Sequence, residues 1–184
     1  MKRTTPIFLS LLTVAASAFA QAPDQAALDK ALLAAPAQLK AGATVIKWKA
    51  DYTYDTLKKG TNKLVCYDKA GMPGVQQAIY SECTSLGNLD RVAQNLKFEA
   101  ITDKAASKAA FDKAEADGTR VKPEFGSVWY HVMGADPDHM RNHMTIAVPG
   151  ATTASLGLPS DNKAGGVWIM NAGSTTAHLM TPGE

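Results

Sequence analysis

The stretch SVWYHVMGADPDHMRNHMTIAV, residues 127–148, contains two apolar runs on either side of a polar segment. Valine, tryptophan and tyrosine are frequent in residues 127–133, which is typical of a β-strand. Residues 144–148 are a second apolar run, and a Pro-Gly pair ends it. Two more short apolar runs follow, at residues 167–170 and 176–180. We therefore predict that the C-terminal third of the chain is an antiparallel β-meander.

A second group of strands is predicted upstream. Residues 44–54 alternate between apolar or aromatic side chains and polar ones, which is the period of a half-buried strand. Residues 58–62, KKGTN, have the composition of a turn, and residues 64–67 follow as the returning strand. This part of the sequence predicts an N-terminal hairpin.

Three segments have apolar residues at helical spacing: residues 25–35, 89–96 and 103–117. Asp24 and Asn88 stand where N-cap residues are expected, and Gly118 stands at a helix C-terminus. Strands that outnumber the helices and are grouped along the chain favour an α+β fold. We expect an antiparallel sheet, made of the meander and the hairpin, packed by two or three helices.

The first 20 residues have the layout of a secretory signal peptide. Lys2 and Arg3 precede an apolar run over residues 6–16, and residues 18–20 form an A-x-A cleavage site. We predict cleavage after Ala20 and an exported mature protein, periplasmic or secreted. No later apolar run has the length of a transmembrane helix.

The mature chain is predicted to contain a helical lead-in segment, residues 21–42, and a single α+β domain, residues 43–184. The whole chain has 19 Lys and Arg against 17 Asp and Glu. Removal of the signal peptide takes away two basic residues and no acidic one, which leaves 17 of each. A balanced charge of this kind argues against a nucleic-acid partner, and the sequence leaves the oligomeric state open.

The only two cysteines are Cys66 and Cys83. In an exported protein an isolated pair is most simply a disulfide. The alternative is a redox or metal-ligating pair, which the spacing disfavours because it is not a C-x-x-C motif and neither cysteine has a neighbouring histidine.

Five short motifs stand out along the chain: LKKGTNKLVCYD (57–68), SEC (81–83), HMTIAVPG (143–150), LPSDNKAGGVWIM (158–170) and AHLMTP (177–182). Together they resemble a group of exported bacterial proteins that has no assigned activity. The group shares a G-T-N-x-x-x-C turn and strand and an L-P-x-D, GG-x-W-x-M, AH-x-M ending. The resemblance covers most of the mature chain and implies a recurrent single domain. It implies no catalytic or binding residues.

The four histidines are the groups best suited to binding a metal or moving a proton: His131, His139, His143 and His178. His139 and His143 would share one helical face if Asp136 capped a turn that begins at Pro137. Two imidazoles at that spacing suit zinc or copper. A metalloprotease would need a glutamate after the first histidine, and Met140 stands there instead.

His131 and His178 fall on predicted strands, and strand pairing could bring them to His143. Three methionines lie close to these histidines in sequence: Met133, Met144 and Met180. Thioether and imidazole together suit copper, above all Cu(I), whereas three or four imidazoles suit zinc. The structural alternatives are a buried histidine with satisfied ring nitrogens, a methionine that fills the core, and a surface position for His139.

The sequence therefore leaves three hypotheses. The leading one is an exported, disulfide-containing domain that binds a metal ion or a small ligand near His131, His143 and His178. The second is a hydrolytic enzyme with a histidine general base, although the chain has no G-x-S-x-G motif. The third is an interaction module of the cell envelope without a small-molecule site.

Overall fold

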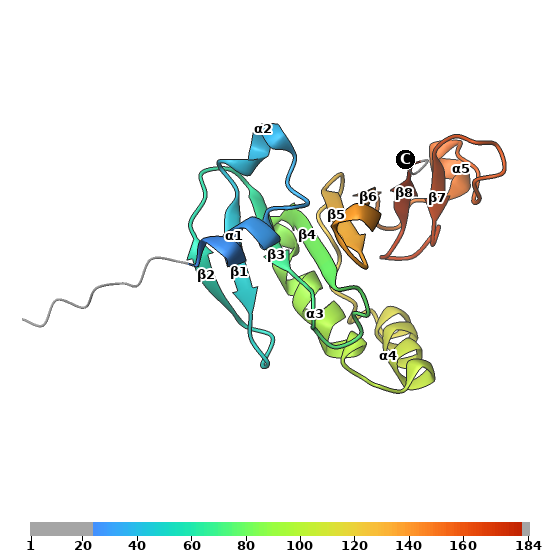
Figure 1. The fold of residues 1–184 in the computed structure, drawn as a ribbon. Coiled ribbons are helices and arrows are strands. Elements are labelled where there is room, and N and C mark those ends of the chain that lie inside the picture. Colours follow the sequence, from blue (N-terminus) through green and yellow to red (C-terminus); the bar gives the residue numbers. More distant parts are fainter. Residues whose placement is uncertain (1–23, 182–184) are drawn as a thin grey trace, which may run out of the picture.

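The computed structural model of the chain describes residues 24–181. The predicted signal peptide and its cleavage site lie outside the described residues. Eight strands form one sheet in the order β2-β1-β3-β4-β5-β6-β8-β7 (Figure 1), and all neighbours are antiparallel except β1 and β3. The strands are β1 Thr44–Trp48, β2 Tyr54–Lys58, β3 Leu64–Asp68, β4 Ile79–Ser85, β5 Val128–Gly134, β6 Arg141–Ala147, β7 Trp168–Met170 and β8 His178–Met180.

Three helices of two turns or more accompany the sheet: α1 Gln25–Ala31, α3 Leu89–Glu99 and α4 Lys104–Ala116. Single turns are α2 Ala37–Lys40, α5 Thr153–Leu156 and the 3-10 turns η1 Leu86–Asn88 and η2 Pro137–His139. The predicted α+β class is confirmed. None of the helices between residues 24 and 181 combines the length and apolar character that a membrane span requires.

Alternate residues of the central strands face two different helices. Val45 and Cys66 pack with α1, whereas Ile46, Val65 and Tyr67 pack with α3. The sheet therefore separates two cores, and α4 lies against α3 (Figure 1). Because consecutive strand residues point to opposite faces, these contacts fix which side chains share the α3 face.

The disulfide prediction is confirmed. Cys66 on β3 and Cys83 on β4 are directly opposite each other, form the disulfide and are fully buried. Leu28 and Ala31 of α1 belong to the same core cluster. Helix α1 therefore packs on the sheet through its apolar stripe. The predicted start of the domain at residue 43 stays a prediction.

Helix α1 is shorter than the predicted span of residues 25–35. Asp24 caps its start as expected, but the helix ends at Ala31. The Ser81 hydroxyl on β4 donates a hydrogen bond to the Ala31 carbonyl (2.7 Å) and accepts one from the Ala34 amide (3.1 Å). These bonds satisfy backbone groups that a longer helix would have paired, so a tertiary contact ends the helix before Pro36 does.

The first hairpin was predicted in the wrong place. The turn lies at residues 49–53, not 58–62, and it joins β1 to β2. The Asp51 carboxylate accepts hydrogen bonds from the Thr53 amide (3.0 Å) and hydroxyl (2.6 Å), and Tyr52 has a φ of 65°. β3 then returns to lie parallel to β1. The alternation of apolar and polar residues continues from β1 through this turn, so the sequence pattern did not show where β1 ends.

The last strands also depart from the sequential order of a meander. β8, not β7, pairs with β6, and β7 lies at the edge of the sheet. The Val148 amide bonds the Ala177 carbonyl at 2.9 Å, and Ala177 is fully buried, whereas Met170 at the end of β7 is exposed. Since Ala177 directly precedes β8 and is buried against the residue that follows β6, β8 is the strand that lies next to β6.

Candidate functional site

A row of polar side chains crosses four neighbouring strands. Tyr67 on β3 is opposite Glu82 on β4, Glu82 is opposite His131 on β5, and His131 is opposite His143 on β6. Directly opposed residues share one face of a sheet. Since Tyr67 packs with α3, the whole row lies on the face that α3 covers.

The two histidines of this row are close neighbours. The ring centroids of His131 and His143 are 5.9 Å apart, and the ring planes are inclined by 30°. β6 begins at Arg141, earlier than residues 144–148 suggested, so His143 lies within the strand instead of at its edge. The longer strand is the reason that the two imidazoles meet.

His178 joins these two histidines at one cavity of about 260 Å³. Its Nδ1 donates a hydrogen bond to the Thr176 carbonyl at 2.7 Å, so in the neutral ring Nε2 carries the lone pair. The cavity lies between the α3 side chains Arg91 and Asn95 and the sheet. Its remaining lining residues are Pro123, Trp129, His131, His143, Thr145, Ala147, Thr176 and Ala177.

Arg91 supplies a buried positive charge to this cavity. The side chain is held by three hydrogen bonds to neutral oxygens: the Val121 carbonyl, the Thr175 hydroxyl (3.3 Å) and the Thr176 hydroxyl (3.0 Å). No carboxylate among residues 24–181 lies within ion-pair distance of the guanidinium. Burial, together with the nearby charge of Arg120, lowers the pKa of Arg91 to about 10, although the charge of Glu115 acts in the opposite direction. A buried cation without a directly paired anion favours the arrival of one.

Behind His131 lies a buried cluster of charged and phenolic groups. Glu82 accepts a hydrogen bond from the Tyr67 hydroxyl, and its Oε2 is 3.6 Å from Lys69 Nζ and 3.4 Å from His131 Nδ1. Lys69 also pairs with Glu99 at 3.3 Å. Although burial alone would raise the pKa of Glu82, the Lys69 charge and the donors from His131 and Tyr67 hold it at about 2. The carboxylate is therefore ionised at neutral pH.

The pKa values of Tyr67 and Lys69 in this cluster, and of the nearby His143, are also shifted from their ordinary values. Burial raises the pKa of Tyr67 well above its ordinary value, and the Glu82 charge raises it further, so its hydroxyl stays protonated. For Lys69 the charges of Glu82 and Glu99 outweigh burial and raise the pKa. Burial lowers the pKa of His143, and the nearby His131 and His178 lower it further. His143 is therefore mainly neutral at pH 7.

His139 does not belong to the cavity. It ends η2, where its Nδ1 is 2.7 Å from Asp136 Oδ1, and its side chain is 76% exposed. Asp136 caps a turn that begins at Pro137, as expected, but β6 starts at Arg141. The predicted helical pairing of His139 with His143 is therefore wrong, because the chain leaves the turn as an extended strand.

The metal hypothesis gains no support from the described residues. Between residues 24 and 181 no group of three or more His, Cys, Asp or Glu side chains is arranged to hold a metal ion. Met133, Met144 and Met180 do not line the cavity that contains all three histidines, although Met144 lines a second cavity, of about 490 Å³, together with His131 and His143. Met144 is opposite Tyr130, so it lies on the other face of the sheet from His143.

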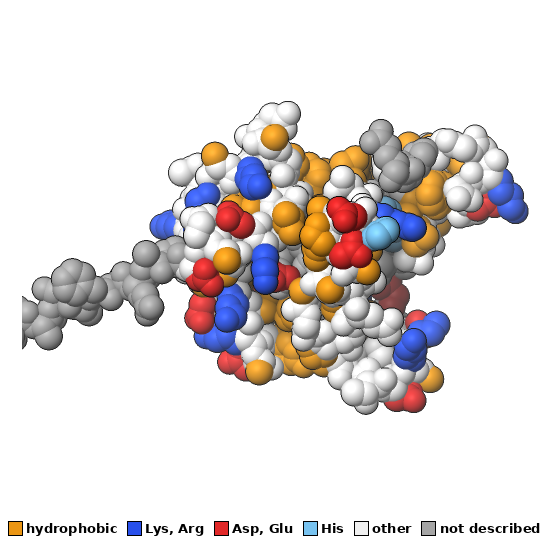
Figure 2. All heavy atoms as spheres, in the orientation of Figure 1, with side chains coloured by type: hydrophobic (Ala, Val, Ile, Leu, Met, Phe, Trp, Pro, Cys, Tyr) orange, Lys and Arg blue, Asp and Glu red, His pale blue; other side chains and the backbone are white. Residues whose placement is uncertain are grey.

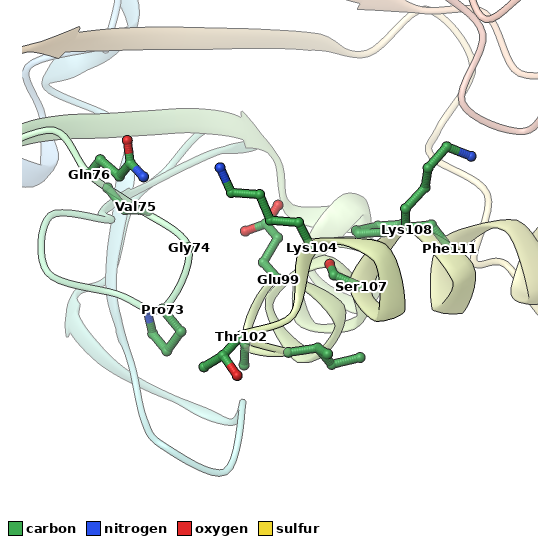
Figure 3. Close-up of a pocket in the computed structure, with 12 residues that line it drawn as sticks. Pro73, Gly74, Val75, Gln76, Glu99, Thr102, Lys104, Ser107, Lys108 and Phe111 are labelled. Atoms are coloured by element: carbon green, nitrogen blue, oxygen red, sulfur yellow. The ribbon is translucent and has the colours of Figure 1, made fainter.

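A larger cavity, about 620 Å³, lies elsewhere, between the loop at residues 73–76 and helices α3 and α4 (Figure 3). Lys104 and Lys108 at its rim are exposed, and Lys108 points away from the space between loop and helix. Glu99 is already paired with Lys69. The charged side chains that line this groove are of both signs and mostly solvated, so the groove is a weaker candidate for the functional site than the cavity with the three histidines.

Sequence reasoning predicted the three histidines but missed Arg91, Glu82 and Lys69. Arg91 lies beside the apolar stripe of α3, and Glu82 lies in a strand whose other residues gave no sign of a charged face. The sequence offered a signal for Glu82 alone: this carboxylate directly precedes Cys83, which was expected to be buried in a disulfide.

No protein-family model matches the chain, and comparisons with curated proteins and with solved structures give no significant match.

Proposed function

We propose that this protein binds a small anionic ligand, such as a carboxylate or phosphate compound, in the cavity lined by Arg91, His131, His143 and His178. The observation that carries the proposal is the charge of the lining: one arginine and three histidines, with no Asp or Glu among the lining residues that the structure describes. Arginine and imidazole donors recognise carboxylate and phosphate oxygens directly.

The rest of the lining fits a small organic anion better than a bare ion. Trp129 and Ala147 add apolar surface, and Thr145 and Asn95 add neutral hydrogen-bonding groups. A mixture of apolar walls and a few polar groups is typical of small-molecule sites. The volume of about 260 Å³ suits a ligand smaller than a drug-sized molecule.

The interaction-module hypothesis has less support. The exposed large apolar side chains are scattered over several elements, and Phe125 is the most exposed of them. Figure 2 shows charged side chains of both signs interspersed on one face of the molecule, with no wide field of one charge. A docking surface for a protein partner usually requires a contiguous apolar patch.

Isothermal titration calorimetry with phosphate, acetate, succinate and citrate tests the proposal. We expect at least one of these anions to bind with a dissociation constant below about 1 mM. Arg91→Lys and His178→Gln should each weaken binding roughly tenfold, since the first loses the planar guanidinium donors and the second loses the imidazole. His139→Gln is the matched control, because His139 is exposed and outside the cavity.

Circular dichroism and thermal melting must show that each variant is folded. Anion binding that is unchanged in folded Arg91→Lys and His178→Gln would place the ligand elsewhere. The absence of binding to any of the anions would disprove the proposal. Titration of zinc and of Cu(I) in the same apparatus tests the metal hypothesis separately.

Export of the protein is part of the same proposal. The Cys66–Cys83 disulfide is consistent with an oxidising compartment. It supports the signal peptide predicted from residues 1–20, and mass spectrometry of the expressed full chain checks it. A mature N-terminus at Gln21 is the expected result, and a chain that retains residues 1–20 would contradict it.

A further inference from the structure

We propose that the cavity also catalyses hydrolysis of a small anionic carboxylic ester, with His131 as general base and Glu82 as the residue that positions it. The inference rests on the proposed anion site, because it uses the same cavity. It goes further by assigning a reaction and separate roles to two residues.

The Glu82 carboxylate lies beside the imidazole of His131. Glu82 Oε2 is 3.4 Å from His131 Nδ1, which is an ion-pair contact, and this buried nitrogen has no hydrogen-bond partner among residues 24–181. A carboxylate at this nitrogen favours the tautomer protonated on Nδ1. The lone pair is then on Nε2, which is the nitrogen that can accept a proton.

The Glu82 carboxylate is held in place from several sides. Tyr67 donates to one oxygen, and Lys69 is 3.6 Å from the other. Lys69 is fixed in turn by Glu99 and lies over the Tyr80 ring at 5.0 Å. Burying this many charges costs stability that an apolar core would not, and simple anion binding does not require a carboxylate behind a binding histidine. General-base catalysis does use such a group, because it orients the imidazole and stabilises the imidazolium.

The His131 imidazole can be reached from the cavity, whose lining offers few nucleophilic side chains. The His131 side chain is 14% exposed and lines the cavity, so the imidazole is not sealed in the core. No serine or cysteine is among the lining residues, and the only hydroxyl groups are those of Thr145 and Thr176. Thr176 already bonds Arg91. Water is therefore the nucleophile that the cavity favours.

The reaction balances without a redox partner. His131 Nε2 takes a proton from water as the water oxygen forms a bond to the ester carbonyl carbon. The negative charge that develops on the carbonyl oxygen is stabilised by the positive field of Arg91. The bond to the leaving alcohol oxygen then breaks, and that oxygen takes the proton from the imidazolium. One ester and one water give one acid and one alcohol.

The test uses the oxidised full chain and 4-nitrophenyl esters, among them acetate and the anionic half-ester of succinate. We expect the wild-type protein to release 4-nitrophenolate faster than buffer, with a preference for the anionic ester. His131→Gln should lower kcat roughly 100-fold or more, as for loss of a general base. The same variant should still bind the anion in calorimetry, weakened roughly tenfold at most because Arg91 and His178 remain, so the larger loss of kcat reports the loss of the general base. His139→Gln should leave kcat unchanged.

Glu82→Gln and Glu82→Asp test the positioning role. We expect a lower kcat in both, with a smaller loss in Glu82→Asp and a changed pH profile of kcat/KM, which a purely structural role would not produce. Wild-type protein that binds anions but hydrolyses none of these esters overturns the catalytic proposal and leaves the binding proposal intact. Turnover that survives in folded His131→Gln overturns the role of His131. Turnover without measurable anion binding would contradict the anion site instead.

Discussion

His131 and His143 are opposite each other on β5 and β6, with ring centroids 5.9 Å apart, and this pairing sets the electrostatics of the cavity. Two imidazoles at this separation oppose each other's protonation, and burial adds to the effect. The lowered pKa of His143 is the result. The site therefore holds its largest positive charge only below neutral pH.

Anion binding should consequently strengthen as the pH falls from 8 to 5.5. A bound anion favours the protonated form of His143, so binding takes up protons. The other charged groups facing this imidazole are His131, His178 and, across the cavity, Arg91. Calorimetry in buffers of different ionisation enthalpy measures the proton uptake. An affinity that does not change with pH would contradict the prediction.

Glu82 should make the fold sensitive to acid. Its pKa is about 2 in the folded protein, below the ordinary value of 4.5, so its contribution to stability is complete above about pH 5. That contribution is lost as the pH falls from about 5 towards 2, because the unfolded chain takes up the proton first. Urea unfolding at a series of pH values measures the loss, and Glu82→Gln should flatten the curve in this range.

Removal of Glu82 should also destabilise the protein at neutral pH. Glu82→Ala leaves the buried Lys69 with Glu99 as its only ion-pair partner among the described residues and the Tyr67 hydroxyl without its acceptor. Breaking a buried pair on one side costs about 3 to 5 kcal/mol of unfolding free energy. Asp55→Ala is a suitable control, since Asp55 pairs with Lys49 on the surface and should cost below about 1 kcal/mol. Equal losses in the two variants would show that the Glu82 cluster does not stabilise the fold.

The disulfide should stabilise the sheet and resist reduction while the protein is folded. Cys66→Ser with Cys83→Ser should lower the unfolding free energy by roughly 3 kcal/mol, which the chain-entropy model gives for a loop of this size. Both cysteines are fully buried, so dithiothreitol should reduce them in urea but only slowly in native buffer. Free-thiol labelling over time measures the rate. Rapid reduction of the native protein would show that the β3–β4 region opens readily.

Asn88 should be a structural residue, not a helix cap. It was predicted to cap the helix that follows, but its side chain makes no capping bond. It accepts from the Glu124 amide at 2.8 Å and donates to the hydroxyls of Thr84 and Ser127 at 2.8 and 2.9 Å. Asn88→Ala removes these three hydrogen bonds, one of them to the fully buried Thr84 hydroxyl, and should cost roughly 2 to 3 kcal/mol in urea unfolding. The exposed Asn162→Ala should change stability by less than about 0.5 kcal/mol, and a similar value for Asn88→Ala would refute the role.

Short-range interactions explain the parts of the fold that were predicted from the sequence. Asp24 caps α1 through its own side chain, as predicted, and Gly118 follows α4 with a φ of 70°. The strand at residues 127–133 and the pairing of the only two cysteines also required no distant contact to be identified. Each of these depends on a few neighbouring residues or on a unique pair, so the residue types alone determine them.

Tertiary structure decided the strand order and the site. The parallel pairing of β3 with β1, the position of β8 beside β6 and the register of His131 with His143 are contacts between distant segments. The sequence specified which residues alternate along each strand, but an alternating pattern fits more than one neighbour and register. Packing of α3 on one face of the sheet then brought Arg91 to the three histidines. The segment at residues 127–148 therefore supplied two imidazoles of the cavity, while β8 and α3 supplied the third imidazole and the arginine.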